Sequence, residues 1–436
     1  MLSNALKHCC QLPQFTVIRL FESYWIQILK SKSKSRCYQI RFYFIEDNHE
    51  NKMIADNDDD VPLLNGNDDD EQLITPEDSQ PNVEAIFVVT FDVKYGNTIE
   101  FQMPEKEQMP LNGVEYKALP SGSHHIHEDF VYFRHESKYG LACIARVDTV
   151  KDEDDGSALS VVDQSQRGMR IKSVGILTSS IIHIQSYLAF LQTEARTYLN
   201  QSSADYDRLK RFLLQHGQPT SVPVSIYDNL FAEFIQQFGA SIFPLTRLIL
   251  LGKRILLHSR SPIGSLCNAV YFTHIINQSV NPLFFVNITD LTMLSNEQSY
   301  IGCTTEIIFK EKTHIYDVFI DCDNEIVFHT NDSILRSIVK ITRSDRNRLQ
   351  KNVTLNSFIN IGNRLSRVLN QLSQSNINNN QQMTKEKFHS VGLHQRYDRL
   401  FLDQYIRIRR IPHITISNPG SVFFPISPCC SCPSSN

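Results

Sequence analysis

The chain has 436 residues, of which 41% are hydrophobic and 21% are charged, and its formal net charge is −4 at pH 7. This length exceeds what one ordinary compact core organises, so two or three domains of a soluble globular protein are expected. The small net charge excludes the broad basic field by which many proteins hold nucleic acid.

The cysteines and the apolar runs also restrict the class of protein. Ten cysteines are scattered along the chain, mostly singly, which indicates reduced thiols in the cytosol rather than a disulfide framework. A membrane span needs about 18 apolar residues without interruption. Arg19 and Glu22 interrupt Phe15–Leu29, and Arg247 interrupts Ile242–Leu257. No transmembrane segment and no secretory signal are predicted.

Residues 53–82 have the composition of an acidic, disordered leader. The runs Asp58–Asp60 and Asp68–Glu71 repel one another, and few apolar residues are available to offset the entropy of ordering the chain. Folding is therefore predicted to begin near Val83.

The segment 83–200 has the pattern of five strands followed by one helix. The apolar run Ile86–Phe91 and the alternating run Thr98–Gln102 flank a glycine-containing turn, which predicts a hairpin whose first strand is central in its sheet. Apolar residues recur at helical steps from Ile181 to Leu199. The other predicted strands are Asp129–Arg134, Leu141–Val147 and Arg170–Leu177, with an exposed insertion at Lys151–Gln166.

A polar linker is predicted at 201–225, and strands alternate with helices in the segment that follows, 226–342. This alternation predicts a second α/β lobe with partly parallel pairing. The predicted helices are Ile226–Phe238, Ser241–Leu251 and Cys267–Ile276; the predicted strands are Arg254–His258 and Leu283–Ile288, closed by a hairpin of Tyr316–Asp321 and Ile326–His329.

Helical patterns dominate the segment 343–418. They cover Leu355–Leu372, break at the Asn-rich Ser373–Gln382 and resume over Lys385–Ile408. The last of these helices is basic, which suggests contact with anionic lipid or an acidic partner, or else a solvated face paired with Asp398 and Asp403. Its arginines are Arg396, Arg399, Arg407, Arg409 and Arg410.

The tail 419–436 contains Cys429, Cys430 and Cys432. Their clustering is consistent with palmitoylation, with half of a thiolate metal site or with an unmodified tail.

The patterns of ordinary catalytic and nucleotide sites are missing from the sequence. A P-loop requires Ser or Thr after Gly-Lys, but Gly252-Lys253 is followed by Arg254. The dinucleotide-binding glycine pattern, the Gly-x-Ser-x-Gly elbow and the His-Glu-x-x-His zinc helix are absent as well. No catalytic residue and no cofactor are predicted.

The histidines His124, His125 and His127 form the cluster most similar to a metal site, because imidazole is a common zinc ligand. No cysteine or carboxylate at ligand spacing accompanies them. A polar loop leading into the next strand is therefore predicted, and no metal.

A series of short motifs spans most of the chain. In their order and approximate spacing, these motifs resemble the DENN-domain proteins, and within them the short LCHN-type members. One motif alone would be weak evidence, whereas the whole series is specific for the family. The motifs are Ala85–Asp92, Ser121–His124, Asp129–Arg134, Tyr139–Cys143, Met169–Leu177, Gly252–Leu256 and Cys303–Phe309, followed by Tyr316–Val318.

The resemblance implies an α/β fold, the tripartite DENN module. Residues 1–52 match nothing in the family, so an upstream extension or a gene-prediction artefact is expected there. The implied parts are a longin-like N-terminal lobe (83–200), a linker (201–225), a Rossmann-like central α/β lobe (226–342), a short helical C-terminal part (343–418) and the tail (419–436).

The resemblance also implies a function, that of a guanine nucleotide exchange factor promoting GDP release from a Rab-family small GTPase. Such a protein is expected in the cytoplasm, with transient peripheral association with vesicle membranes. The alternative is a non-catalytic GTPase-binding adaptor or tether. The implied GTPase contacts are Ser259, Arg260 and Ser261. The alternative for this segment is an ordinary strand-to-helix connection in which Ser261 caps a helix opened by Pro262.

Overall fold

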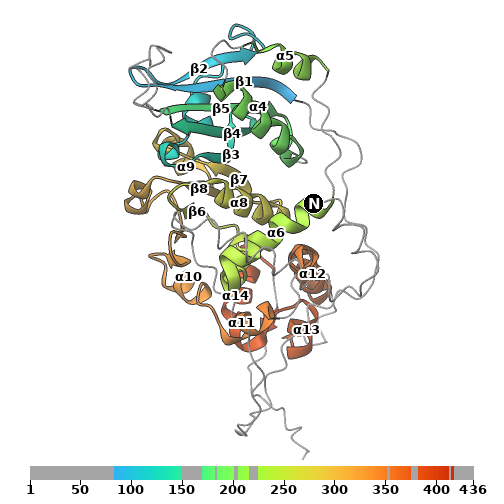
Figure 1. The fold of residues 1–436 in the computed structure, drawn as a ribbon. Helices are drawn as coiled ribbons and strands as arrows, with labels where there is room; N and C mark the ends of the chain where they lie inside the picture. The colour runs from blue at the N-terminus through green and yellow to red at the C-terminus, as the bar shows by residue number, and fades with distance from the viewer. Residues whose placement is uncertain are drawn as a thin grey trace, which may run out of the picture. The chain divides into compact units, whose positions relative to one another are not determined.

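The computed structural model describes most of the chain from Val83 onward (Figure 1). The predicted leader, residues 1–52, the insertion at Lys151–Gln166 and the cysteine-containing tail lie outside the described residues. The described ranges are 83–148, 169–181, 184–200, 205–215, 224–350, 354–374, 382–411 and 414–416.

The described strands form a ten-stranded mixed sheet in the order β10-β9-β6-β8-β7-β3-β4-β5-β1-β2, beside a two-stranded sheet of β11 (Gln382–Met383) and β12 (Thr415–Ile416). We call β1 to β5 the antiparallel half and β6 to β10 the parallel half of the large sheet. The α/β class predicted from the sequence is confirmed. The strands are β1 (Val83–Asp92), β2 (Gly96–Met103), β3 (Glu128–His135), β4 (Lys138–Asp148), β5 (Met169–Thr178), β6 (Ile255–His258), β7 (Asn281–Phe285), β8 (Tyr300–Thr304), β9 (Val318–Asp321) and β10 (Val327–His329).

The antiparallel half confirms the predicted hairpin. β1 pairs with both β2 and β5, so it lies inside the sheet, and this explains its nearly continuous apolar run. Two aromatic rings cover glycines on the neighbouring strand: Phe87 lies opposite Gly175, and Phe133 lies opposite Gly140. A Cβ atom added at either glycine would collide with the facing ring. The glycines therefore make room for aromatic packing within the sheet.

Helix α3 (Val114–Ala118) packs on β2 to β5, and two longer helices also cover this half. The predicted amphipathic helix begins later than expected: a 3-10 turn at Ile184–Tyr187 precedes α4 (Leu188–Asn200), which packs on β4 and β5. The predicted polar linker contains helix α5 (Asp207–Leu214), which contacts β1. Its Leu209 is fully buried, and the Phe212 ring stacks on Phe190 with a centroid distance of 4.2 Å.

In the parallel half, β6 pairs in parallel with β8 and β9, and β7 pairs in parallel with β8, as the alternation of strands and helices predicts. Helices α8 (Gly264–Ile276) and α9 (Leu291–Asn296) connect these strands. The predicted strand Leu283–Ile288 is wrong at its end. The structure has β7 over Asn281–Phe285, followed by a 3-10 turn that Asn287 and Asp290 initiate with reciprocal side-chain to backbone hydrogen bonds.

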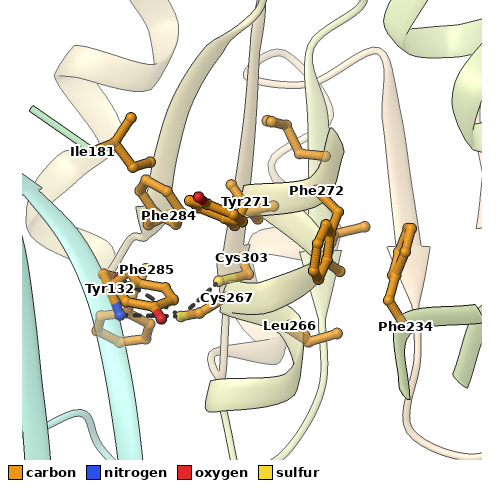
Figure 2. Close-up of a cluster of buried hydrophobic side chains, with 14 of the residues drawn as sticks. Tyr132, Ile181, Phe234, Leu266, Cys267, Tyr271, Phe272, Phe284, Phe285 and Cys303 are labelled. Carbon is orange, nitrogen blue, oxygen red and sulfur yellow. Dashed lines mark hydrogen bonds between the residues drawn. The ribbon is translucent and has the colours of Figure 1, made fainter. Parts of the chain in front are cut away.

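The two halves join in one continuous sheet through a single residue pair, Phe133 of β3 and Phe285 of β7. Figure 2 shows the core around this junction. The backbone N–H of Tyr132 donates to Cys267 Sγ over 3.4 Å, and Cys267 Sγ lies 3.7 Å from Cys303 Sγ. Burial raises the pKa of Cys303 well above its usual range, so this sulfur stays protonated and acts as core packing.

Helices from before and after the parallel half form the helical part of the structure. The prediction of one helix over Lys385–Ile408 is wrong: the chain breaks at Gly392, whose φ of 76° is left-handed, and resumes after it. The helices are α6 (Val224–Phe238), α7 (Ile242–Leu250), α10 (Ser333–Ile338), α11 (Arg343–Leu349), α12 (Leu355–Gln374), α13 (Lys385–Ser390) and α14 (Gln395–Ile408).

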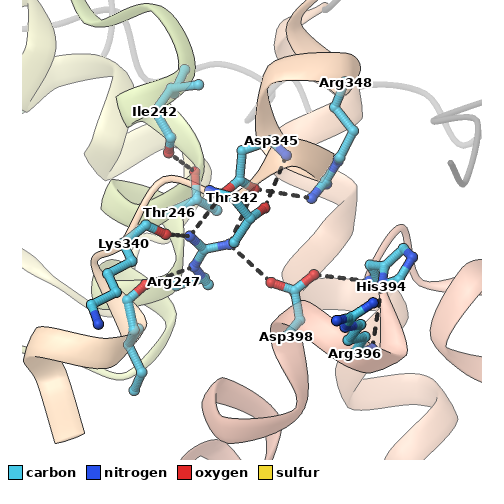
Figure 3. A network of polar contacts seen from close by, with 11 residues as sticks. Ile242, Thr246, Arg247, Lys340, Thr342, Asp345, Arg348, His394, Arg396 and Asp398 are labelled. Carbon is cyan, nitrogen blue, oxygen red and sulfur yellow. Dashed lines mark hydrogen bonds and ion pairs between the residues drawn. The ribbon is translucent and has the colours of Figure 1, made fainter. Parts of the chain in front are cut away.

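A buried ion network ties three of these helices together (Figure 3). Arg247 of α7 lies 3.1 Å from the Asp345 carboxylate of α11 and 2.9 Å from the Asp398 carboxylate of α14. It also donates to the backbone carbonyls of Ile338 and Lys340. Burial alone would lower the pKa of Arg247, but the attraction of the two carboxylates outweighs burial and raises it. The arginine that interrupts the apolar run Ile242–Leu257 is therefore a cross-link between helices.

Candidate functional site

The candidate site lies at the carboxyl edge of the parallel strands. β6 ends at His258, β8 at Thr304 and β9 at Asp321, and strand pairing sets these three residues side by side. Open α/β sheets bind their ligands at this edge, because the loops that leave neighbouring parallel strands converge there.

The predicted contact residues Ser259, Arg260 and Ser261 form the loop that leaves β6. The Ser259 N–H donates to the carbonyl of Thr304, and the Arg260 N–H donates to Asp323 Oδ1 over 2.6 Å. The guanidinium of Arg260 is 89% exposed, and its Nε lies 3.4 Å from Asp323 Oδ2. Backbone hydrogen bonds thus fix the loop, while its cationic group faces solvent.

A loop from the antiparallel half meets this edge. Thr305 Oγ1 donates to the carbonyl of Ser121, and a Cβ atom added at Gly122 would lie 3.0 Å from Ser261 Oγ. The motif Ser121–His124 and the loop Ser259–Ser261 are therefore neighbours in space. The structure thus places one motif of the series next to the loop of predicted contact residues.

The amino terminus of α8 is held from the antiparallel half as well. The Asp129 carboxylate accepts the N–H groups of Ile263, over 2.7 Å, and of Gly264, over 3.1 Å. Burial raises the pKa of Asp129, and these hydrogen bonds oppose the rise. The loop connects a strand to a helix, as the alternative interpretation expects, but its capping detail is wrong. Helix α8 begins at Gly264 rather than Pro262, and Asp129 of β3 rather than Ser261 accepts its first N–H groups.

An exposed apolar strip borders the site. It consists of Ile288, Ile307 and Ile308, whose exposed fractions are 43%, 55% and 51%. Glu306 lies among them: burial raises the pKa of its carboxyl, while a hydrogen bond from the backbone N–H of Ile288 opposes the rise. No sequence pattern predicts this strip, because Ile307 and Ile308 belong to an apolar run of the kind that is usually buried. In the structure, only Phe309 of that run is buried.

The histidines considered as metal ligands lie in the loop of the antiparallel half that precedes β3. His124 and His125 belong to a 3-10 turn, where the ring centroids of His124 and Phe91 are 5.3 Å apart. Among the described residues, a set of three side chains that could share an ion occurs elsewhere, at the carboxyl edge itself: His258, Asp321 and Asp323, with ligand atoms within 4.8 Å of one another.

The basic face of α14 is partly paired. Arg407 contacts Asp403 over 3.0 Å, as the alternative of a paired, solvated face predicts. The predicted pairing with Asp398 is wrong, because Asp398 is buried and contacts Arg247. In the part of the chain that the structure describes, no helix combines the length and apolar character that crossing a membrane requires.

Comparison with known proteins agrees with the motif series. The family model for DENN domain-containing protein 11 matches residues 86–225 and 215–332. A DENN domain-containing protein 11 from Danio rerio is 30% identical over 416 residues, covering 82% of this chain and 81% of the relative. The relative of the same name from Mus musculus is 32% identical over 400 residues, covering 78% and 83%. The one from Xenopus laevis is 32% identical over 310 residues, covering 63% and 67%. The resemblance to DENN-domain proteins is thereby confirmed, and the chain belongs to the DENN domain-containing protein 11 family.

Proposed function

We propose that this protein is a guanine nucleotide exchange factor that promotes GDP release from a Rab-type small GTPase. The observation that carries the proposal is the surface at the carboxyl edge, where loops from both halves of the sheet meet beside the exposed Arg260. Membership in the DENN family supports the same function.

Exchange requires no nucleophile and no proton transfer from the activator. GDP is held by phosphate-binding backbone amides, a lysine and Mg²⁺, with mobile switch segments ordered over them. A surface that binds the switches in a displaced arrangement weakens the binding of nucleotide to the GTPase. Because coupling is reciprocal, nucleotide weakens the binding of this surface to the GTPase by the same factor. The lack of an ordinary catalytic motif in the sequence is compatible with this mechanism.

The carboxyl-edge surface has the composition that such binding needs. An arginine whose loop is already fixed loses less entropy when it pairs with a partner's carboxylate or carbonyl, and arginine is enriched among residues that dominate binding energy. The apolar strip of Ile288, Ile307 and Ile308 supplies area that a partner can remove from water. A rigid platform with one exposed cation and adjacent apolar area is suited to a protein partner.

The decisive measurement is GDP release from a panel of purified Rab proteins, with the full chain added in catalytic amounts. We expect accelerated release from at least one Rab, and tighter association with its nucleotide-free form than with its GDP form. Stoichiometric binding to a GTP form without acceleration would instead identify an adaptor or tether. No effect on any Rab would contradict the proposal.

A charge reversal tests the site within this function. Arg260→Glu is expected to lower the rate of Rab GDP release at least about tenfold, because it places a negative charge where the partner is proposed to meet a positive one. Arg211→Glu, at an exposed position on α5, is the matched control and should leave the rate unchanged. Equal rates for both variants would remove Ser259–Ser261 from the contact surface.

We also propose that the protein works in the cytoplasm and visits membranes peripherally. The four cysteines of the described residues are all unpaired, which suits a reducing compartment. The exposed arginines at the end of α14 supply cations that anionic lipid could attract.

A further inference from the structure

His258 is a buried polar group whose environment calls for an explanation. It is 2% exposed, and within the described part of the chain neither Nδ1 nor Nε2 has a hydrogen-bond partner. Its ring stacks on Phe319, with a centroid distance of 5.6 Å. A buried polar atom without a partner destabilises the folded state, so each such group in a folded protein calls for a physical explanation.

The unpartnered imidazole faces two carboxylates. His258 Nδ1 lies 3.6 Å from Asp321 Oδ1, too far for a hydrogen bond, and Asp323 follows at the turn between β9 and β10. The two aspartates are half-buried, and one ligand atom from each of the three side chains falls within 4.8 Å of the others. Ligand atoms around a tetrahedral ion lie about 3.3 Å apart, so small rotations of the carboxylates close the remaining gap.

We propose that His258, Asp321 and Asp323 bind a first-row divalent cation, with Zn²⁺ as the expected ion. One imidazole nitrogen with two carboxylate oxygens suits Zn²⁺ and disfavours Mg²⁺ and Ca²⁺, which prefer oxygen ligands alone. Three protein ligands leave a fourth position for water or for an oxygen from a partner. Cys322 between the two aspartates is not among the proposed ligands, because its thiol donates to the carbonyl of Ile320.

The surrounding groups are compatible with a cation. Lys310 Nζ lies 4.0 Å from Asp321 Oδ2, and the Arg260 guanidinium lies 3.4 Å from Asp323. Both cationic side chains reach solvent and can swing outward when an ion binds. The backbone N–H of Arg260 donates to Asp323 Oδ1, which orients this ligand as a hydrogen bond commonly does at metal sites. The proposed ion would thus fix the Asp321–Asp323 turn and the Arg260 loop together.

The test is metal binding by the full chain, measured without any GTPase, so its outcome is independent of the proposed exchange activity. Zn²⁺ affinity is measured by chelator competition, and Co²⁺ serves as a spectroscopic substitute. We expect one equivalent of Co²⁺ with visible d–d bands and without the ultraviolet charge-transfer band of a thiolate ligand. That last feature separates this site from the cysteines of the tail.

Three variants assign the ion to the site. Asp321→Asn and Asp323→Asn are each expected to weaken Zn²⁺ binding at least about tenfold, since loss of a mere supporting hydrogen bond already costs 10–100-fold at metal sites. An Asn at position 323 still offers an oxygen to the Arg260 N–H, so the loop should keep its structure, and circular dichroism checks this. Glu325→Gln, exposed in the same turn, is the matched control and should bind as the unmodified chain does. The site is rejected if both Asp variants retain full affinity, or if the Co²⁺ spectrum is that of thiolate ligands.

Discussion

Replacing Arg247 by methionine is expected to lower the free energy of unfolding by about 3–5 kcal/mol, the cost of leaving one partner of a buried ion pair alone. The change removes the guanidinium nearest to Asp345 and Asp398, whose side chains are 1% and 2% exposed, and leaves Arg348 at 3.9 Å from Asp345. Methionine preserves much of the side-chain volume, so the lost stability is due to the unpaired charge rather than to a cavity. Urea unfolding followed by circular dichroism measures the free energy of unfolding.

Two controls separate this cause from others. Adding Asp398→Asn to Arg247→Met should recover part of the loss, because asparagine still accepts the N–H group of His394 but carries no charge, while Asp345 keeps Arg348 as a partner at 3.9 Å. Arg407→Ala breaks the exposed pair with Asp403 and should change stability by only about 0–1 kcal/mol. If the double variant proves as unstable as the single one, unpaired charge is not the reason.

Gly140→Ala is expected to destabilise the protein by about 1–3 kcal/mol, as overpacked cores do. The added methyl group would fall where the Phe133 ring now lies, because Phe133 of β3 is paired with Gly140 of β4. Phe133 also forms the residue pair with Phe285 that joins the two halves. We therefore expect faster hydrogen exchange at the amides of β3 and β7 as well as a lower urea midpoint.

Gly362→Ala is the matched control for this substitution. Its new Cβ atom would lie 3.0 Å from the terminal Cδ2 methyl group of Leu250, and Gly362 lies inside helix α12. Alanine is favoured over glycine in a helix by about 1 kcal/mol, so this variant should be neutral or stabilised. No loss from Gly140→Ala would show that the Phe133 ring yields without cost, and equal losses from both variants would show that the ring contact is not the specific cause.

Much of the fold could be predicted because strand patterning reports burial directly. The internal position of β1 follows from its continuous apolar run, and the parallel pairing of β6 follows from strands that alternate with helices. Strand β8 was missed, since Tyr300–Thr304 contains a glycine and a threonine and carries no alternation. The short helices α9, α10 and α11 also escaped, because six or seven residues give a weak periodic signal.

The candidate site shows where local patterns stop being informative. The resemblance located the loop Ser259–Ser261, but nothing in a linear pattern pairs Asp129 with the amino terminus of α8, or Asp398 with Arg247. Similarly, His258 and Asp321 are neighbours only because β6 and β9 pair in parallel register. Contacts between residues far apart in sequence depend on topology, which periodicity does not encode.

The way in which Arg247 is held has a practical consequence for anyone who expresses pieces of this protein. A truncated polypeptide ending at residue 342, the limit that sequence patterns suggest for the central lobe, would lack Asp345, Asp398 and the helices α11 to α14. Arg247 would lose its carboxylate partners, and apolar side chains of α7 that are now buried would be exposed to water. Such a fragment should be insoluble or molten. Cloning boundaries for the carboxyl-edge surface therefore have to extend through α14, at least to Ile408.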